Sequence, residues 1–267
     1  MLLTKKDRLK AILLGVIYFL LAVIIDFISS FFTYLSGDRV LVVCEVILAV
    51  MCPLSIISCL WAYGNKILTR ATKLVYNELR PGQFIEEYDA LRNSPNLVVN
   101  KPSQSVFQLV AYAYYLMGER EKCLETYDEM IKTANAKKRP YATLLKVSAM
   151  YEYGMCDEAE KLFLETQRGK LTLVQVGLVN NVIKHERAMV RGDYNIAESS
   201  MHEIIGRDFP KPNNSELLVC HWRLAKIHME KDEIDLAIPH LDYCATSGGE
   251  TAIRTEAMKK LSELTEK

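Results

Sequence analysis

The chain has 267 residues, half of them hydrophobic, and carries 33 Lys and Arg against 33 Asp and Glu. A chain of this length and apolar content can bury a sizeable core. Its balanced charge provides no overall positive field for nucleic acid, so we do not expect a nucleic-acid-binding protein.

Two long apolar stretches dominate residues 1–64. Residues 11–35 contain Asp26 as their only charged side chain, and residues 40–63 contain only Glu45. At a rise of 1.5 Å per residue, each helix would be long enough to cross a hydrocarbon core of about 30 Å. The first stretch is too long for the apolar part of a cleaved signal peptide. We therefore predict a membrane anchor of two transmembrane helices that form a tight antiparallel hairpin.

Basic residues flank the hairpin on the side of both chain termini. They are Lys5, Lys6, Arg8 and Lys10 before the first stretch, and Lys66, Arg70 and Lys73 after the second. The connecting loop carries only Arg39, next to Asp38. Because positively charged flanks stay on the cytoplasmic side, we expect an integral protein of the plasma membrane. Both termini and the rest of the chain would then be cytoplasmic.

Asp26 and Glu45 are expected to lie inside the bilayer, where a carboxyl group is costly and faces protein or water. Their depths would differ by roughly 7 Å, given the helical rise per residue. One hypothesis makes them a contact with another membrane protein, or a proton-sensitive site. The other makes them protonated acids that are hydrogen-bonded within the hairpin.

Residues 65–100 are interpreted as two connecting helices. The turn formers Arg80, Pro81 and Gly82 separate two stretches that each carry an apolar stripe. These helices would also fit a degenerate first repeat that joins the following domain to the bilayer. Residues 93–105 are rich in turn formers and form the clearest linker.

The remaining residues, 101–267, contain internal repeats, best seen in the stretch 104–135. Apolar residues at helical spacing form one stripe before Gly118 and another after it. The first stripe consists of Phe107, Val110, Ala111 and Tyr114, and the second of Cys123, Tyr127, Met130 and Ile131. Neither helix can bury its stripe alone, so we expect the two to pack as a hairpin against a neighbouring pair.

The same unit recurs three more times, with turns spaced by 36, 38 and 40 residues at Gly118, Gly154, Gly192 and Asp232. A small residue follows each turn by five positions: Cys123, Ala159, Ala197 and Ala237. A large apolar residue follows by nine: Tyr127, Phe163, Met201 and Leu241. Seven residues before the turns stand Ala111, Val147, His185 and Ala225. Such periods are typical of helical solenoids. We predict an all-α fold of four helix pairs and a cap, at about 104–137, 140–173, 178–211, 218–249 and 250–266.

This pattern resembles the tetratricopeptide repeat over residues 104–249. The best-matched unit has aromatic, small and glycine positions at the spacing of that repeat: Phe107, Ala111, Tyr114, Gly118, Cys123 and Tyr127. The resemblance implies stacked hairpins whose first helices line a concave groove for a protein partner. The chain departs from the pattern at Lys146, Lys184 and His185. Its units are also longer than 34 residues, so a related helical-hairpin solenoid fits as well. Pro239 is expected to kink or delay the last pair's second helix.

Motifs for catalysis or metal binding are lacking, because the sequence has no GxSxG, HExxH, P-loop or Gly-rich dinucleotide turn. His221 and His228 are two helical turns apart, about 10 Å, which is too far to share a zinc ion. His185 and His228 fall within the apolar stripes, where a hydrogen-bonded core histidine is expected. We therefore expect no enzyme, no metal or other cofactor, and no small-molecule substrate.

The groove implied by the resemblance would be aromatic and apolar, with two cations at one end. The predicted partner-binding residues are Tyr112, Tyr115, Tyr141, Tyr151, Met189, Trp222, Arg223 and Lys226. Packing between neighbouring repeats is the other explanation for the aromatic residues. The family's clamp for a terminal carboxylate needs Lys and Asn where this chain has Gln108 and Tyr112, so that role is not expected.

These observations predict a membrane-anchored, cytoplasm-facing scaffold or adaptor. Its groove would bind an apolar or aromatic segment of a partner protein, with Arg223 and Lys226 favouring an acidic end of that segment. The alternative is an accessory subunit of a membrane transport or secretion complex. Such a subunit would bind through the transmembrane hairpin, by way of Asp26 and Glu45.

Overall fold

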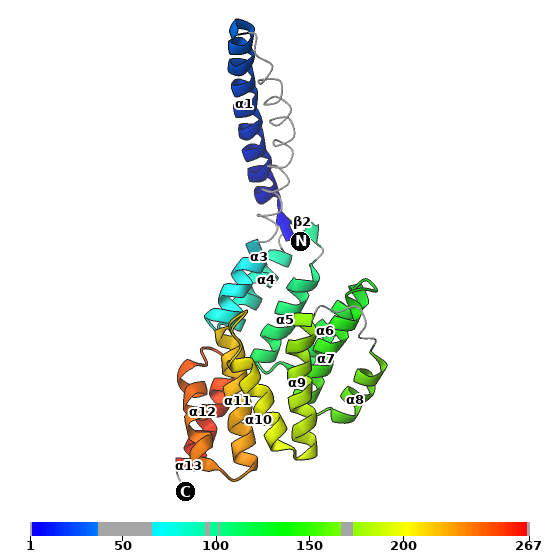
Figure 1. The fold of residues 1–267 in the computed structure, drawn as a ribbon, viewed down its shortest axis with the longest axis vertical. Coiled ribbons are helices and arrows are strands. Elements are labelled where there is room, and N and C mark those ends of the chain that lie inside the picture. The colour runs from blue at the N-terminus through cyan, green and yellow to red at the C-terminus, as the bar shows by residue number, and fades with distance from the viewer. Residues whose placement is uncertain (1, 37–65, 94–96, 101, 167–172, 266–267) are drawn as a thin grey trace. The chain divides into compact units, whose positions relative to one another are not determined.

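The computed structural model describes residues 2–36, 66–93, 97–100, 102–166 and 173–265 (Figure 1). Within these residues the chain is helical apart from one pair of short strands, so the predicted all-α class is confirmed. The chain divides into two compact units. One comprises residues 1–69 and 88–102, and the other comprises residues 70–87 and 103–267.

The first unit contains a small antiparallel sheet. Its strands are β1 (Leu2–Thr4) and β2 (Leu97–Asn100), and Leu2 lies opposite Asn100. β2 therefore lies within the stretch that we interpreted as a linker. The β-branched residues Val98 and Val99 favour extended backbone there.

Helix α1 (Lys5–Ser36) includes the whole of the first predicted span. Its large apolar side chains are exposed from Leu9 to Ile28, and the six consecutive residues 16–21 are all exposed. Since a helical turn has 3.6 residues, apolar surface is open on every face of this part of the helix. No helix among the described residues combines the length and the hydropathy needed to span a membrane. The second predicted span, 40–63 with Glu45, lies outside the described residues, as does the side chain of Asp26.

Three short segments precede the repeats: α3 (Lys66–Ala71), the π-helical η1 (Thr72–Asn77) and α4 (Pro81–Arg92). The repeats form the pairs α5 (Gln104–Leu116) and α6 (Arg120–Thr133), α7 (Arg139–Glu152) and α8 (Cys156–Glu165), α9 (Leu173–Arg191) and α10 (Tyr194–Ile205), and α11 (Asn214–Glu230) and α12 (Ile234–Ser247), followed by α13 (Ala252–Thr265). Neighbouring helices pack on each other in a solenoid-like manner. α12 begins at Ile234 and includes Pro239, so the proline does not delay this helix.

The turns inside the four pairs share one backbone geometry. Each turn residue named by the repeat pattern has a positive φ: Gly118 (75°), Gly154 (74°), Gly192 (74°) and Asp232 (61°). In every turn the following residue donates its N–H to a carbonyl five residues back, as Glu119 does to Tyr114. This left-handed cap satisfies a carbonyl that the ending helix leaves free. Glycine fits because it lacks Cβ, and Asp is among the few other residues that adopt this conformation.

The three repeated side-chain positions of the pattern face the core. All twelve residues at these positions are 5% exposed or less. His185, which stands where a small residue is expected, places Nδ1 3.1 Å from the carbonyl of Ala197. Because a carbonyl only accepts, Nδ1 is the donor. Burial lowers the pKa of His185 to about 3, so this core histidine is neutral.

We expect that leucine at Ala159 or Ala197 overpacks the helix contacts and destabilises the protein by about 1–3 kcal/mol. Both alanines are fully buried between the helices of their pair. Thermal melts of the full chain in detergent would measure the effect. Ser199→Leu, on the exposed face of α10, is the control for the added apolar volume. Melting points unchanged in both alanine variants would show that these positions are not close contacts.

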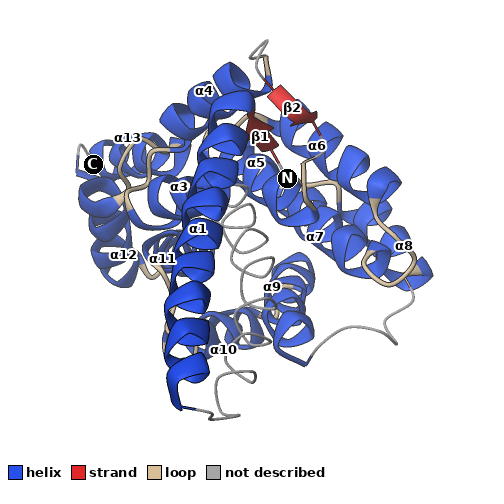
Figure 2. Cartoon of the chain, turned by 90° about the horizontal axis from the view of Figure 1, so that it is seen from above, coloured by secondary structure: helices blue, strands red, loops and turns tan. Residues whose placement is uncertain are grey.

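The helix pairs of the second unit follow one another around a curve, as Figure 2 shows from above. The end of this curve returns to its start, because α11 packs against η1, which also packs against α5. The Tyr112 hydroxyl donates to Ser215 Oγ at 3.2 Å, across 103 residues of sequence. Side chains that are distant in sequence therefore meet inside the curve.

Candidate binding pocket

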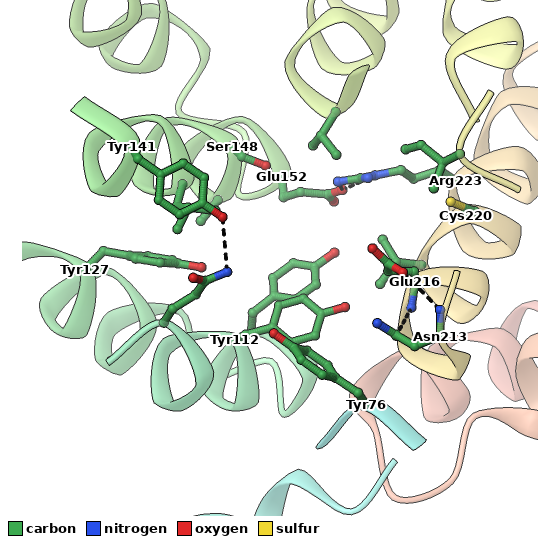
Figure 3. Close-up of a pocket in the computed structure, with 17 residues that line it drawn as sticks. Tyr76, Tyr112, Tyr127, Tyr141, Ser148, Glu152, Asn213, Glu216, Cys220 and Arg223 are labelled. Atoms are coloured by element: carbon green, nitrogen blue, oxygen red, sulfur yellow. Dashed lines mark hydrogen bonds and ion pairs between the residues drawn. The ribbon is translucent and has the colours of Figure 1, made fainter. Parts of the chain in front are cut away.

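A pocket of about 340 Å³ lies inside the curve, and side chains from η1, α5, α6, α7 and α11 line most of it (Figure 3). Its aromatic lining consists of Tyr76, Tyr112, Tyr115, Tyr127 and Tyr141. Its polar lining consists of Gln108, Ser148, Glu152, Asn213, Glu216 and Arg223. The apolar remainder is Leu145, Ala149, Val182, Ile204, Val219 and Cys220.

The tyrosine wall is held by contacts between rings. The rings of Tyr112 and Tyr115 stack with centroids 5.8 Å apart, and Tyr76 tilts against Tyr112 at 5.7 Å. Gln108 Nε2 donates to the Tyr141 hydroxyl at 3.4 Å. Aromatic pairs of this kind contribute about 0.5–1.5 kcal/mol beyond their area burial. The wall is therefore ordered before any ligand arrives.

The start of α11 forms the facing wall. Asn213 is the N-cap, and its Oδ1 accepts from the Glu216 N–H at 3.0 Å. The Glu216 carboxylate accepts in return from the Asn213 N–H at 2.9 Å and from Arg207 Nη2 at 3.0 Å. This capping box satisfies two backbone donors of the helix start. It also fixes both side chains at the edge of the pocket.

A group of four ionisable side chains, three of them buried and Lys226 at its rim, lies at the inner end of the pocket. Arg223 is 4% exposed and binds Glu152 of α7 through its guanidinium, while its Nε lies 3.2 Å from Glu186 Oε1 of α9. Lys226 Nζ lies 3.3 Å from Glu152 Oε2. This group, which we call the α7–α9–α11 ion cluster, joins three helices from different repeats.

The pKa values of the two carboxyl groups in the ion cluster are shifted in opposite directions. Burial favours the neutral form of both, but Arg223 and Lys226 hold the pKa of Glu152 far below its usual range. For Glu186, burial and the neighbouring Glu152 charge raise the pKa to about 8. Protonation of Glu186 is therefore favoured, which leaves Glu152 as the main counter-charge of Arg223 and Lys226.

The eight predicted partner-binding residues divide into two groups. Four of them, Tyr112, Tyr115, Tyr141 and Arg223, line the pocket, and the other four do not. Tyr151 is buried, and its hydroxyl donates to Glu160. Met189 packs against the core shared by α9, α10 and α11, and Lys226 lies 5.7 Å from the ring of Trp222.

Arg223 and Lys226, which we expected to favour an acidic end of the ligand, both have partners within the protein. Both are already paired with Glu152, and Arg223 also with Glu186. Buried charges require such partners. The pairing depends on helices far apart in sequence, so the local pattern does not show it.

Several pocket residues were not among the predicted ones. Glu152 stands four residues after Ser148 on α7, and the two share one helical face. A groove-facing stripe on α7 that is continued by one turn beyond Ser148 includes Glu152. Tyr127 was assigned to packing only. Tyr76 lies in η1, before the repeats, and no repeat position indicates it.

No family model, curated protein or solved structure matches the chain.

Three histidines meet on the side of α11 and α12. His221 Nδ1 lies 2.8 Å from His240 Nδ1, and the rings of His228 and His240 stack at 5.6 Å. His228 is buried and contacts Glu233 Oε2 at 2.8 Å through Nδ1. The expectation that His185 and His228 are hydrogen-bonded core residues is confirmed. In the described ranges, no group of three or more His, Cys, Asp or Glu side chains is arranged to hold a metal ion.

Proposed function

We propose that this protein is a membrane-anchored adaptor that binds an apolar or aromatic segment of a partner protein in the pocket. The observation that carries the proposal is the convergence of five tyrosines from η1, α5, α6 and α7 on one cavity closed by α11. Concave, mostly apolar sites with a few placed polar groups are the usual ligand sites of proteins. Binding of a chain segment by a helical solenoid follows the groove-binding mode.

The tyrosines suit this role better than a purely structural one. Tyr112 and Tyr115 are only partly buried, and both line the cavity, although Tyr115 also packs against the core of α5, α6 and α7. Aromatic side chains bring large contact area at low conformational cost, and they dominate interface energetics when desolvated. The ordered wall described above would reduce the entropy lost on binding.

We expect Tyr115→Ala to weaken partner binding by about thirtyfold, as truncation of one aromatic anchor typically does. A photo-crosslinking side chain at Tyr141 should capture the partner in native membranes. The same group at Tyr243, which lies on α12 and does not line the pocket, is the control. Capture from Tyr243 alone, with unchanged affinity of the Tyr115→Ala variant, would contradict the proposal.

The membrane part of the proposal is supported by the exposed apolar surface of α1 between Leu9 and Ile28. Apolar patches of this extent mark protein or membrane contacts. The basic residues before and after the two apolar stretches support a cytoplasmic position for both termini and for the helix pairs. The short loop after Ser36 would then lie outside the cytoplasm.

The topology makes a direct prediction. In intact cells, a membrane-impermeant maleimide should label Ser36→Cys and should not label Ser103→Cys, because only the loop after Ser36 would be outside. The unmodified chain gives the background from its natural cysteines. After the cells are opened, both variants should react. Labelling of Ser103→Cys but not of Ser36→Cys in intact cells would mean that the orientation is reversed.

A second candidate function is the accessory subunit whose membrane hairpin binds a transport or secretion component. The observation in its favour is again the open apolar surface around residues 16–21 of α1, which a membrane protein partner would cover. In this case Asp26 and Glu45 would carry the specificity. The pocket would then be incidental to binding.

A further inference from the structure

The pocket offers hydrogen-bond donors that no side chain of its own uses. In the described part of the chain, the hydroxyls of Tyr76, Tyr115 and Tyr127 have no hydrogen-bond partner. Some side-chain oxygens, such as Tyr153 Oη and Gln104 Oε1, are fully buried and lack a hydrogen-bond partner, but the three hydroxyl oxygens are not among these buried atoms. These three phenols therefore open to the cavity rather than to the sealed core.

A fourth phenol adds to this set. The Tyr141 oxygen accepts from Gln108, so its own proton remains free to be donated. Figure 3 shows the hydroxyls of Tyr127 and Tyr141 directed toward the interior of the pocket. Burial raises the pKa of Tyr76, Tyr115, Tyr127 and Tyr141 above the usual phenol value. All four phenols keep their protons at neutral pH and act as donors.

The two carboxylates and the Asn213 amide oxygen in the lining already accept hydrogen bonds. Glu152 accepts from Arg223 and Lys226. Glu216 accepts from Arg207 and from the Asn213 N–H, and Asn213 Oδ1 accepts from Ser215 Oγ and the Glu216 N–H. The four phenol protons are therefore the uncommitted donors of the cavity. A ligand group that only accepts hydrogen bonds matches it, because a buried donor left unpaired is costly.

We propose that the pocket recognises an acidic side chain of the bound segment, whose carboxylate accepts hydrogen bonds from the phenols of Tyr115, Tyr127 and Tyr141. This inference rests on the proposed function, because a segment lying across the pocket reaches into it with side chains. An ionised carboxylate has about four acceptor sites and no donor. Bonds from neutral donors to a charged acceptor are roughly twice as strong as neutral pairs.

The ion cluster favours the same ligand charge. Its Arg223 lines the pocket, and the raised pKa of Glu186 weakens the negative charge that offsets Arg223 and Lys226. The hydrogen bonds to the ligand carboxylate come from neutral phenols. We therefore expect only weak salt dependence, in contrast to a site built on free lysine or arginine.

The test uses the full chain in detergent and pools of seven-residue peptides with amidated C-termini. Flanking positions are drawn from alanine, leucine, phenylalanine and tyrosine, and the central residue is glutamate in one pool and glutamine in the other. Mass spectrometry of captured peptides gives the ratio between the pools. A third pool has central glutamine and a free C-terminal carboxylate. The variants are Tyr115→Phe and Tyr127→Phe, with Tyr243→Phe as the matched removal of a hydroxyl outside the pocket.

We expect the glutamate pool to be captured at least tenfold better by the unmodified chain and by Tyr243→Phe. Each pocket variant should lower this ratio by about tenfold. A ratio that persists in both pocket variants overturns the role of the phenols. Preference for the third pool overturns the side-chain assignment. Equal capture of the two amidated pools overturns the inference alone, whereas no capture of any pool overturns the proposed function as well.

Discussion

Replacing Arg223 by methionine should destabilise the protein by about 3–5 kcal/mol, the typical effect of removing one partner of a buried ion pair. Arg223 is 4% exposed and neutralises Glu152, whose side chain is 6% exposed. Without the guanidinium, the remaining cation beside the Glu152 carboxylate is the more exposed Lys226 at 3.3 Å. The residue joins α7, α9 and α11, so we expect a large fall in the melting temperature of the full chain.

The double variant Arg223→Met with Glu152→Gln separates charge from packing. If the loss comes from an unpaired buried carboxylate, neutralising Glu152 should recover most of the stability, because two matched neutral groups are tolerated. Lys226→Met is the control for a cation at the rim of the same cluster, and its effect should be smaller. A double variant as unstable as Arg223→Met would show that the loss of stability comes from poor packing of methionine and not from the unpaired carboxylate.

The second large effect concerns pH. The pKa of Glu186 is raised to about 8 in the folded chain by burial and by the charge of Glu152, against 4.5 for the ordinary side chain. Below about pH 4.5 both states hold the proton, so stability does not change with pH through this group. Between pH 4.5 and 8 the unfolded chain releases the proton and the folded chain keeps it, so stability falls by up to about 1.4 kcal/mol per pH unit. The stabilising contribution is lost as pH rises through 8.

Glu186→Gln should remove this dependence, because glutamine does not titrate. We expect the variant to gain stability relative to the unmodified chain as the pH is raised from 5 to 8.5, in melts recorded across that range. Glu129→Gln, on the exposed surface of α6, is the control and should leave the profile unchanged. Parallel profiles for Glu186→Gln and the unmodified chain would contradict the assigned protonation of Glu186.

The repeat pattern predicts much of the second unit because its signals are local. A residue with φ near 75° must be one that tolerates it, and Gly118, Gly154 and Gly192 stand where the chain turns. The small residues Ala159 and Ala197 mark close helix contacts for a similarly local reason. His185 shows the limit of this reasoning. It replaces a small residue by hydrogen-bonding to Ala197 across the pair.

The pocket could be predicted only in part, because it depends on the curve of the solenoid. The spacing of residues along the predicted helices predicts that Tyr112, Tyr115 and Tyr141 lie on one surface, and the three do line one cavity. Spacing did not predict that α11 returns to the side of η1, which brings Tyr76 to Tyr112. Nor does it predict that Arg223 pairs with Glu152 of α7. Long-range closure of this kind has no signature in the local sequence.

The central claim, that the pocket binds the partner, is tested most directly by partner recovery from detergent-solubilised native membranes. One variant set changes the pocket, with Tyr115→Ala and Tyr127→Ala, and the other changes the hairpin, with Asp26→Asn and Glu45→Gln. Melting of each purified variant confirms that the helix pairs remain folded. We predict that the partner is lost with the pocket set and retained with the hairpin set. Loss with the hairpin set alone would contradict the claim and favour the accessory-subunit function.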